Sequence, residues 1–193
     1  MDYETRPVGA FLDDVASARV TPAGGTAGAV VGAIGTACCE MVCRHLEAAG
    51  VATDADLGGL QTELESCRDH LLALGAADAA VVEALFGPDG DPDRATRKRA
   101  VGVPLALAET CLPALEAAVV MTGAADRPVV ADALTGSYFL EAAVRSAAAT
   151  ARGNLAAVEE EPFRAETEHR LSDVATATDR ALAAVRENVD GAA

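Results

Sequence analysis

The chain has 193 residues, of which 51% are hydrophobic and only 3% aromatic, and its formal net charge is −15, from 30 acidic and 15 basic residues. This charge argues against nucleic-acid binding, which depends on basic surfaces that contact phosphates. Acid excess with a single lysine, Lys98, instead fits a cytoplasmic protein adapted to high salt, where ions screen the repulsion. The length suits one domain covering residues 1–193.

The first predicted helix covers residues 8–18, after an acidic start with no apolar segment typical of a signal peptide. Phe11, Leu12 and Val15 are spaced to form one apolar face, and Asp13 and Asp14 are then expected to face water.

A glycine-rich stretch follows, without a charged residue from position 20 to position 39. Pro22 suits the first turn of a helix, because its missing N–H would be unpaired there in any case. Behind it, Gly24, Gly25 and Thr26 present free backbone N–H groups, which form a natural site for an anion or a carboxylate.

The glycines of this helix, at positions 25, 28, 32 and 35, share one face. Each costs a helix about 1 kcal/mol relative to alanine, so the pattern predicts close approach of another backbone or of a ligand. We therefore expect Gly25 and Gly28 to accept no side chain larger than alanine. Helix packing alone would explain the pattern as well, and a membrane span is a weaker reading because the stretch is mostly alanine and glycine. The helix is expected to end near Gly50.

The remaining elements are also predicted to be helices, with kinks at Pro104 and Pro113 and a surface loop at 87–93. The third helix is expected to begin at residue 53 or 54 and to end at residue 75, with a continuation over 77–86. The last three helices are expected at 94–122, 129–158 and 163–189. No strand-like alternation occurs, so the fold class is an all-α bundle of five to seven helices, several of them long, with a Gly-rich turn that opens a small-residue helix.

The five cysteines form no CxxC motif and lie without histidine or aspartate at metal-ligand spacing. They are expected to be small buried hydrophobes in a reducing compartment, and no metal is expected. They are Cys38, Cys39, Cys43, Cys67 and Cys111.

Four segments, in this order, resemble the cyclodeaminase/cyclohydrolase family of folate enzymes, which includes the C-terminal domain of formiminotransferase-cyclodeaminase. They are FLDDVASARVTPAGGTAGAVVGAIGTA from Phe11, HLLALGAAD at 70–78, VPLALAETCLPALE at 103–116 and VVADALTGSYFLEAAVRSAAATARGNL at 129–155. The chain departs from the family pattern at Ala23, where a glycine is usual, at Thr26 for serine, at Ala76 for an acid and at Val82 for an aromatic residue. These departures put the substrate in question and leave the fold unaffected.

The resemblance implies a tetrahydrofolate derivative as substrate and no metal. The implied reactions are ring closure of 5-formiminotetrahydrofolate to 5,10-methenyltetrahydrofolate with release of ammonia, and hydrolysis of the methenyl form to 10-formyltetrahydrofolate. Both need proton transfer at nitrogen, which a carboxyl group in apolar surroundings can perform. Asp78, in the segment GAADAAVV, is the first candidate for this role.

Several other residues are predicted to belong to the site, and more than one role is open for each. Asp132 is expected to be a second proton-transfer group, a pterin ligand or a helix cap. Arg152 and Asn154 are expected either to orient the substrate or to form a buried structural pair. Pro22, Gly24, Gly25 and Thr26 are expected to bind substrate. The alternative function is a non-catalytic folate-binding or structural subunit.

The expected partners are the folate and a second copy of the chain, in a homodimer or larger even oligomer. The glycine face offers more small-residue surface than one helix needs, and the resemblance also implies self-association. No nucleic acid or membrane partner is expected.

Overall fold

A computed structural model describes residues 3–86, 92–124 and 129–191, and in these ranges it contains six α-helices and no strand. The prediction of an all-α bundle of five to seven helices is confirmed. The helices are α1 (Val8–Val15), α2 (Gly24–Ala48), α3 (Leu57–Phe86), α4 (Arg94–Ala124), α5 (Val130–Leu155) and α6 (Glu161–Gly191).

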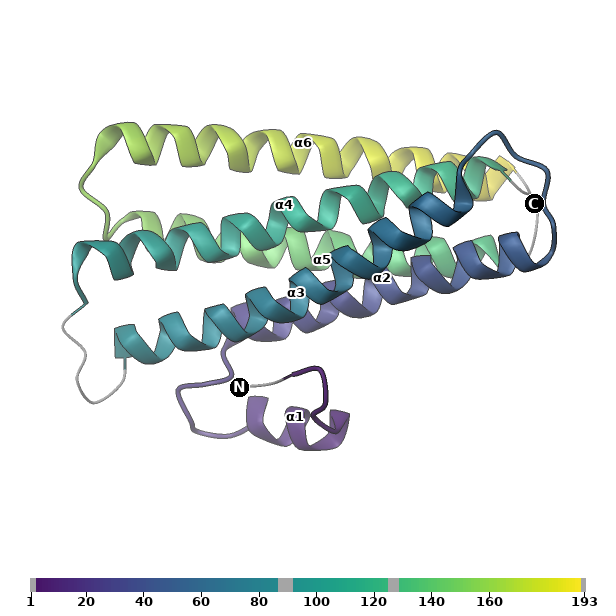
Figure 1. Cartoon of the computed structure of the whole chain (residues 1–193). Coiled ribbons are helices and arrows are strands. Elements are labelled where there is room, and N and C mark those ends of the chain that lie inside the picture. Colours follow the sequence, from purple (N-terminus) through teal and green to yellow (C-terminus); the bar gives the residue numbers. More distant parts are fainter. Residues whose placement is uncertain (1–2, 87–91, 125–128, 192–193) are drawn as a thin grey trace.

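Helices α2 to α6 form an elongated up-and-down bundle, and the short α1 lies outside it, against α2 and α3 (Figure 1). Residues that meet between helices give the directions: Thr26 meets Asp78, and Arg145 meets Asp179. Successive long helices therefore run in opposite directions. Helix α6 packs on α4 and α5, on the side of the bundle away from α2 and α3 (Figure 1).

The glycine face of α2 is used inside the subunit, in contacts with α3, α4 and α5. A Cβ atom on Gly35 would lie 2.7 Å from the backbone oxygen of Gly136, and one on Gly136 would lie 2.6 Å from that of Gly35. The backbones of α2 and α5 thus touch at this crossing, as the glycine pattern predicted. Gly32 packs against Ala143 and Cys111 farther along the same face.

Helix boundaries differ from the expected ones in a few places. Pro22 precedes α2, which begins at Gly24 with Ala23 as its N-cap. At the other end of α2, Gly50 adopts a φ of 63°, and hydrogen bonds back from Gly50 and Val51 close the helix. Helix α3 is capped by Asp56, not by Thr53 or Asp54, and it continues without a break to Phe86.

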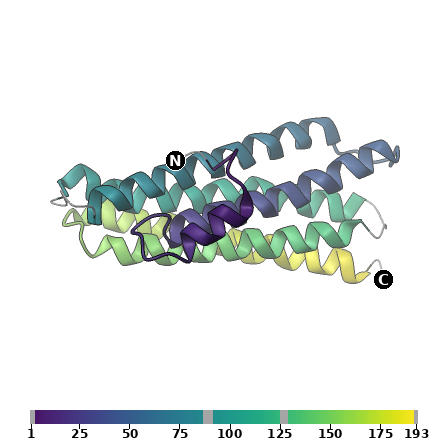
Figure 2. The ribbon, with the colours of Figure 1, turned by 90° about the horizontal axis from the view of Figure 1, so that it is seen from below.

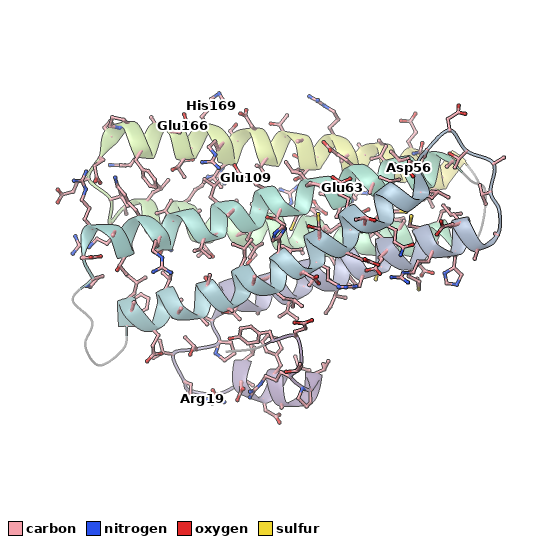
Figure 3. All side chains as sticks on the ribbon, viewed as in Figure 1. Arg19, Asp56, Glu63, Glu109, Glu166 and His169 are labelled. Atoms are coloured by element: carbon pink, nitrogen blue, oxygen red, sulfur yellow. The ribbon has the colours of Figure 1, made fainter. Side chains whose placement is uncertain are left out.

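The prediction for α1 is correct at Phe11, which is buried, and at Asp13, which is exposed. It is wrong at the other three positions, because Leu12 and Val15 face solvent, with Leu12 57% exposed, and Asp14 is buried. Arg6 and Arg19 both form ion pairs with Asp14, and these pairs offset the cost of burying its charge. Figure 3 shows Arg19 on the segment that follows α1, outside the long-helix bundle.

Helices α2 and α4 are long and apolar enough to cross a membrane by composition, with mean hydropathy of 1.5 and 1.6 over their most apolar windows. About half of each window, 56% and 50%, is buried inside the bundle, as in the core helices of globular proteins. The cysteines also belong to the core. Four of the five are buried, Cys38 is half-buried and all five are free thiols.

Candidate active site

Asp78 lies on α3 and faces the first turn of α2. Its side chain is only 5% exposed, and its Oδ2 atom accepts a hydrogen bond of 2.8 Å from the hydroxyl of Thr26, which is fully buried. Gly25 lies against the carboxyl group, because a Cβ atom there would be 2.3 Å from Asp78 Oδ1. Glycine is therefore required at position 25 for the carboxyl to rest on the backbone of α2.

The free amide groups at the start of α2 face a carboxyl group of the chain itself, that of Asp78. No side chain caps this helix, and its first i to i+4 hydrogen bond runs from Ala27 to Ala23. The amide groups before Ala27 lack acceptors within the helix. Asp78 takes this position, with both the hydroxyl and the backbone N–H of Thr26 favouring its ionised form.

Burial raises the pKa of Asp78 above its ordinary value of 3.8, and the two groups of Thr26 oppose this rise without cancelling it. The setting of this carboxyl is unlike that of the other buried acids. Asp14 is paired with two arginines, and Glu40 with Arg44 and Arg68. Asp78 has no basic partner within the described part of the chain. A buried, uncompensated carboxyl with a raised pKa is suited to proton transfer.

Tyr3 is a third component of this site, and the sequence analysis did not find it. Its side chain is 8% exposed, and its ring packs edge to face on Phe11 with 5.6 Å between centroids. Burial raises the pKa of Tyr3, and the Asp78 carboxyl adds to the rise. A lone tyrosine near the start of the chain carries no periodic signal, so no sequence pattern could have placed it here.

Asp132 does not meet Asp78 within one subunit. It is exposed in the first turn of α5, near Cys38, whose pKa is raised by burial and further by the charge of Asp132. Cys38 lies twelve residues beyond Thr26 on α2, which corresponds to about 18 Å along a helix. An acid in a first turn also stabilises the helix itself. Asp132 is not the cap of α5, because the N-cap is Val129 and no side chain caps this helix, and the other two roles of Asp132 stay predictions.

Arg152 and Asn154 lie at the same end of the bundle as Asp78 but engage other helices. Arg152 is exposed and forms an ion pair of 3.2 Å with Glu168 of α6. Asn154 donates a hydrogen bond of 2.7 Å to the backbone oxygen of Ala100 in α4. Arg152 and Asn154 therefore do not form the buried pair that was the structural alternative, although each contact joins two helices.

The remaining predicted residues surround the start of α2. Pro22 is buried, in a cis peptide bond after Thr21, and Gly24 is exposed with open space beside it. Of the expected substrate-binding residues, the structure therefore brings Gly25 and Thr26 into contact with Asp78. The described residues contain no group of three or more histidine, cysteine or acidic side chains placed to hold a metal.

These features define an all-α bundle with a buried carboxyl at the start of a Gly-rich helix. A family model described as formiminotransferase-cyclodeaminase matches residues 7–173. The methenyltetrahydrofolate cyclohydrolase of Methylorubrum extorquens is 30% identical over 179 residues, which cover 85% of each chain. The crystal structure of formiminotetrahydrofolate cyclodeaminase from Thermotoga maritima has the same fold, with a TM-score of 0.89 at 20% identity over 97% of this chain and 98% of that one. The chain belongs to the formiminotransferase-cyclodeaminase family, a family of folate-processing enzymes, and the resemblance seen in the sequence is confirmed.

Proposed function

We propose that this protein is a folate one-carbon enzyme that hydrolyses 5,10-methenyltetrahydrofolate to 10-formyltetrahydrofolate, with Asp78 as the group that transfers protons. Membership of the family supports the folate substrate, and the 30% identity to a methenyltetrahydrofolate cyclohydrolase favours hydrolysis over deamination. The observation that carries the proposal is the burial of Asp78 without a basic partner within the described part of the chain.

In the hydrolysis, a water molecule attacks the methenyl carbon while the ionised Asp78 takes one of its protons. The bond from this carbon to N5 then breaks, and the carboxyl returns the proton to N5, which leaves the formyl group on N10. The hydroxyl proton of the intermediate goes to solvent, so one water is consumed and one proton is released. A raised pKa suits Asp78 to both steps, because it makes the carboxylate a stronger base and brings the pKa closer to the working pH.

The deamination uses the same group. N10 of 5-formiminotetrahydrofolate attacks the formimino carbon and gives its proton to the carboxylate, and the carboxyl then protonates the nitrogen that leaves as ammonia. One further proton from solvent balances the positive charge of the methenyl product. The Thermotoga maritima protein of the same fold is named as a cyclodeaminase, so both reactions are to be assayed.

The departures at Ala76 and Val82 support one other candidate, a folate-holding subunit without turnover. An absorbance assay with the methenyl and the formimino substrates, at molar salt, distinguishes these functions. Turnover of either substrate supports the enzyme, binding without turnover supports the holding subunit, and neither binding nor turnover contradicts the assignment to folate.

We further propose a homodimer or larger even oligomer in the cytoplasm. Because the glycine face is covered within the subunit, the support comes from large apolar side chains that α1, α2 and α5 expose. They are Val8, Leu12, Val15, Ile34, Met41, Tyr138 and Phe139. Figure 2 shows α1 lying across the same side of the bundle as the start of α2.

A further inference from the structure

Residues 3–20 form an arm outside the long helices, packed against α2 and α3 (Figures 1 and 2). The arm is held together from within, because Arg6 and Arg19 both pair with Asp14, and all three residues belong to it. It therefore has the internal contacts needed to move as one unit.

The attachment of the arm to the long helices is small. Tyr3 and Phe11 are its buried apolar side chains, and they pack on Ala79 of α3, with Val30 of α2 alongside. On the outer side of α1, Val8 is 73% exposed. A helix of eight residues is not stable alone, so the arm depends on this small contact for its position.

The hydroxyl of Tyr3 is an unusual feature of the contact between the arm and the long helices. It is buried, and it has no hydrogen-bond partner among the residues that the structure describes. Thr26 lies near enough to lower the pKa of the phenol, but the contact lacks the geometry of a hydrogen bond in this arrangement. Leaving a buried polar group without a partner is unfavourable, and proteins rarely keep such a group without a use.

The same arm lies next to the proposed proton-transfer group, because Tyr3 is close enough for the charge of Asp78 to act on its phenol. Asp78 is too deeply buried to touch a bound folate in this closed arrangement. The long helices are fixed by extensive packing on one another, whereas the arm has only its small contact, so the arm is the element that can move.

We propose that the arm opens to admit the folate and closes on it, and that the Tyr3 hydroxyl then donates a hydrogen bond to a polar atom of the folate beside its one-carbon unit. This inference rests on the proposed function and adds a substrate-binding residue and a moving element to the same site. Because burial raises the pKa of Tyr3, its hydroxyl stays protonated and able to donate at neutral pH.

The test uses Tyr3→Phe, which keeps the ring that packs on Phe11 and removes only the hydroxyl. The matched control is Tyr138→Phe, since the chain has two tyrosines and Tyr138 is exposed on α5, where its hydroxyl accepts a hydrogen bond from Arg186. The probe is 5-formyltetrahydrofolate, a stable folate, and its dissociation constant is measured by calorimetry in molar salt. We expect Tyr3→Phe to weaken binding about 3–10-fold, the loss of one hydrogen bond, and the control to bind like the parent.

Thermal unfolding separates this role from a structural one. Because the hydroxyl has no partner in the free protein, its removal is expected to leave the melting temperature unchanged or to raise it. A lower melting temperature with unchanged affinity would mean that the hydroxyl serves stability, and it would overturn the proposal.

Hydrogen exchange on the unaltered protein tests the movement without a variant. We expect the amides of residues 3–20 to exchange more slowly when 5-formyltetrahydrofolate is bound, because closure of the arm protects them. Unchanged exchange at saturating folate would overturn the proposal. If the parent protein neither binds nor converts any folate, the proposed function fails. If the parent and Tyr3→Phe bind folate equally well, the proposed function stands and the role of the Tyr3 hydroxyl is overturned.

Discussion

The hydroxyl of Thr26 donates a hydrogen bond to Oδ2 of Asp78 at 2.8 Å, and both side chains are buried. This contact joins the first turn of α2 to α3, and it stabilises the ionised form of a carboxyl whose surroundings disfavour charge. The protonation of Asp78 thus reflects a balance between burial and one donor residue.

Thr26→Val removes the hydroxyl at nearly constant volume, so the pKa of Asp78 is expected to rise further. If the ionised carboxylate takes the proton from water, turnover falls on the acid side of the pH profile with its midpoint at this pKa. The acid-side midpoint of kcat should therefore move to higher pH in Thr26→Val and stay in place in Thr26→Ser. The same midpoint in all three proteins would show that the Thr26 hydroxyl does not set the pKa of Asp78.

Gly25 and Gly28 are expected to respond differently to alanine. At Gly25 the new Cβ would lie 2.3 Å from Asp78 Oδ1, so the carboxyl must turn away, and turnover is expected to fall about 10–100-fold. At Gly28 the nearest atom would be Ser146 Oγ at 3.6 Å, an ordinary contact. Gly28→Ala should keep full activity and gain up to about 1 kcal/mol of stability from helix propensity. Steady-state kinetics and thermal unfolding of the pair check this, and equal activity in both variants would contradict the close contact at Gly25.

The helices could be predicted from the sequence because apolar spacing and breakers mark them directly. The close approach of α2 to another backbone was also predictable, since the shared face of its glycines is a local pattern. Its location was not, because the contact of Gly35 with Gly136 depends on which helix pairs with α2 and in what register.

The site was predictable only in part. Asp78 and Thr26 were both proposed from the resemblance, and the structure places them in contact. The burial of Asp14 could not be seen, because the arginines that pair with it come from segments without regular structure. The separation of Asp132 from Asp78 follows from the antiparallel pairing of α2 and α5, which no local pattern encodes.

A net charge of −15 is expected to make the fold depend on salt. Ions at molar concentration screen the repulsion between surface carboxylates to within about 3 Å, and dilute buffer removes this screening. Dialysis to low salt should therefore lower both the helicity measured by circular dichroism and the melting temperature. Unchanged helicity and melting temperature after dialysis would remove the case for adaptation to high salt.

Self-association should bury the apolar side chains that α1, α2 and α5 expose. Light scattering in molar salt is expected to give the mass of a dimer or a larger even oligomer. Leu12→Glu places a charge on the exposed side of α1, away from the packing of Phe11, and should shift the population toward monomer if α1 lies in the interface. A stable monomer of the unaltered chain would contradict the proposed assembly.

Asp78→Asn provides its own folding control. Because burial raises the pKa of Asp78, the folded protein binds this proton more tightly than the unfolded chain does. The carboxyl then costs the folded state stability as pH rises from the ordinary value of 3.8 through the raised one, and that cost is complete above the raised pKa. The variant is therefore expected to be at least as stable as the parent at pH 7, and the difference should disappear below about pH 3.8.

Proton transfer by Asp78 is tested most directly by the turnover number of Asp78→Asn with 5,10-methenyltetrahydrofolate, measured in molar salt beside the parent and Asp132→Asn. Asparagine keeps the size of the side chain and an acceptor for Thr26 but cannot transfer the proton. We expect folate binding to survive and turnover to fall at least about 100-fold, within the range of about 10²–10⁴ for loss of a general acid or base. Asp132→Asn should remain close to the parent. Near-normal turnover in Asp78→Asn would contradict the assignment of proton transfer to Asp78.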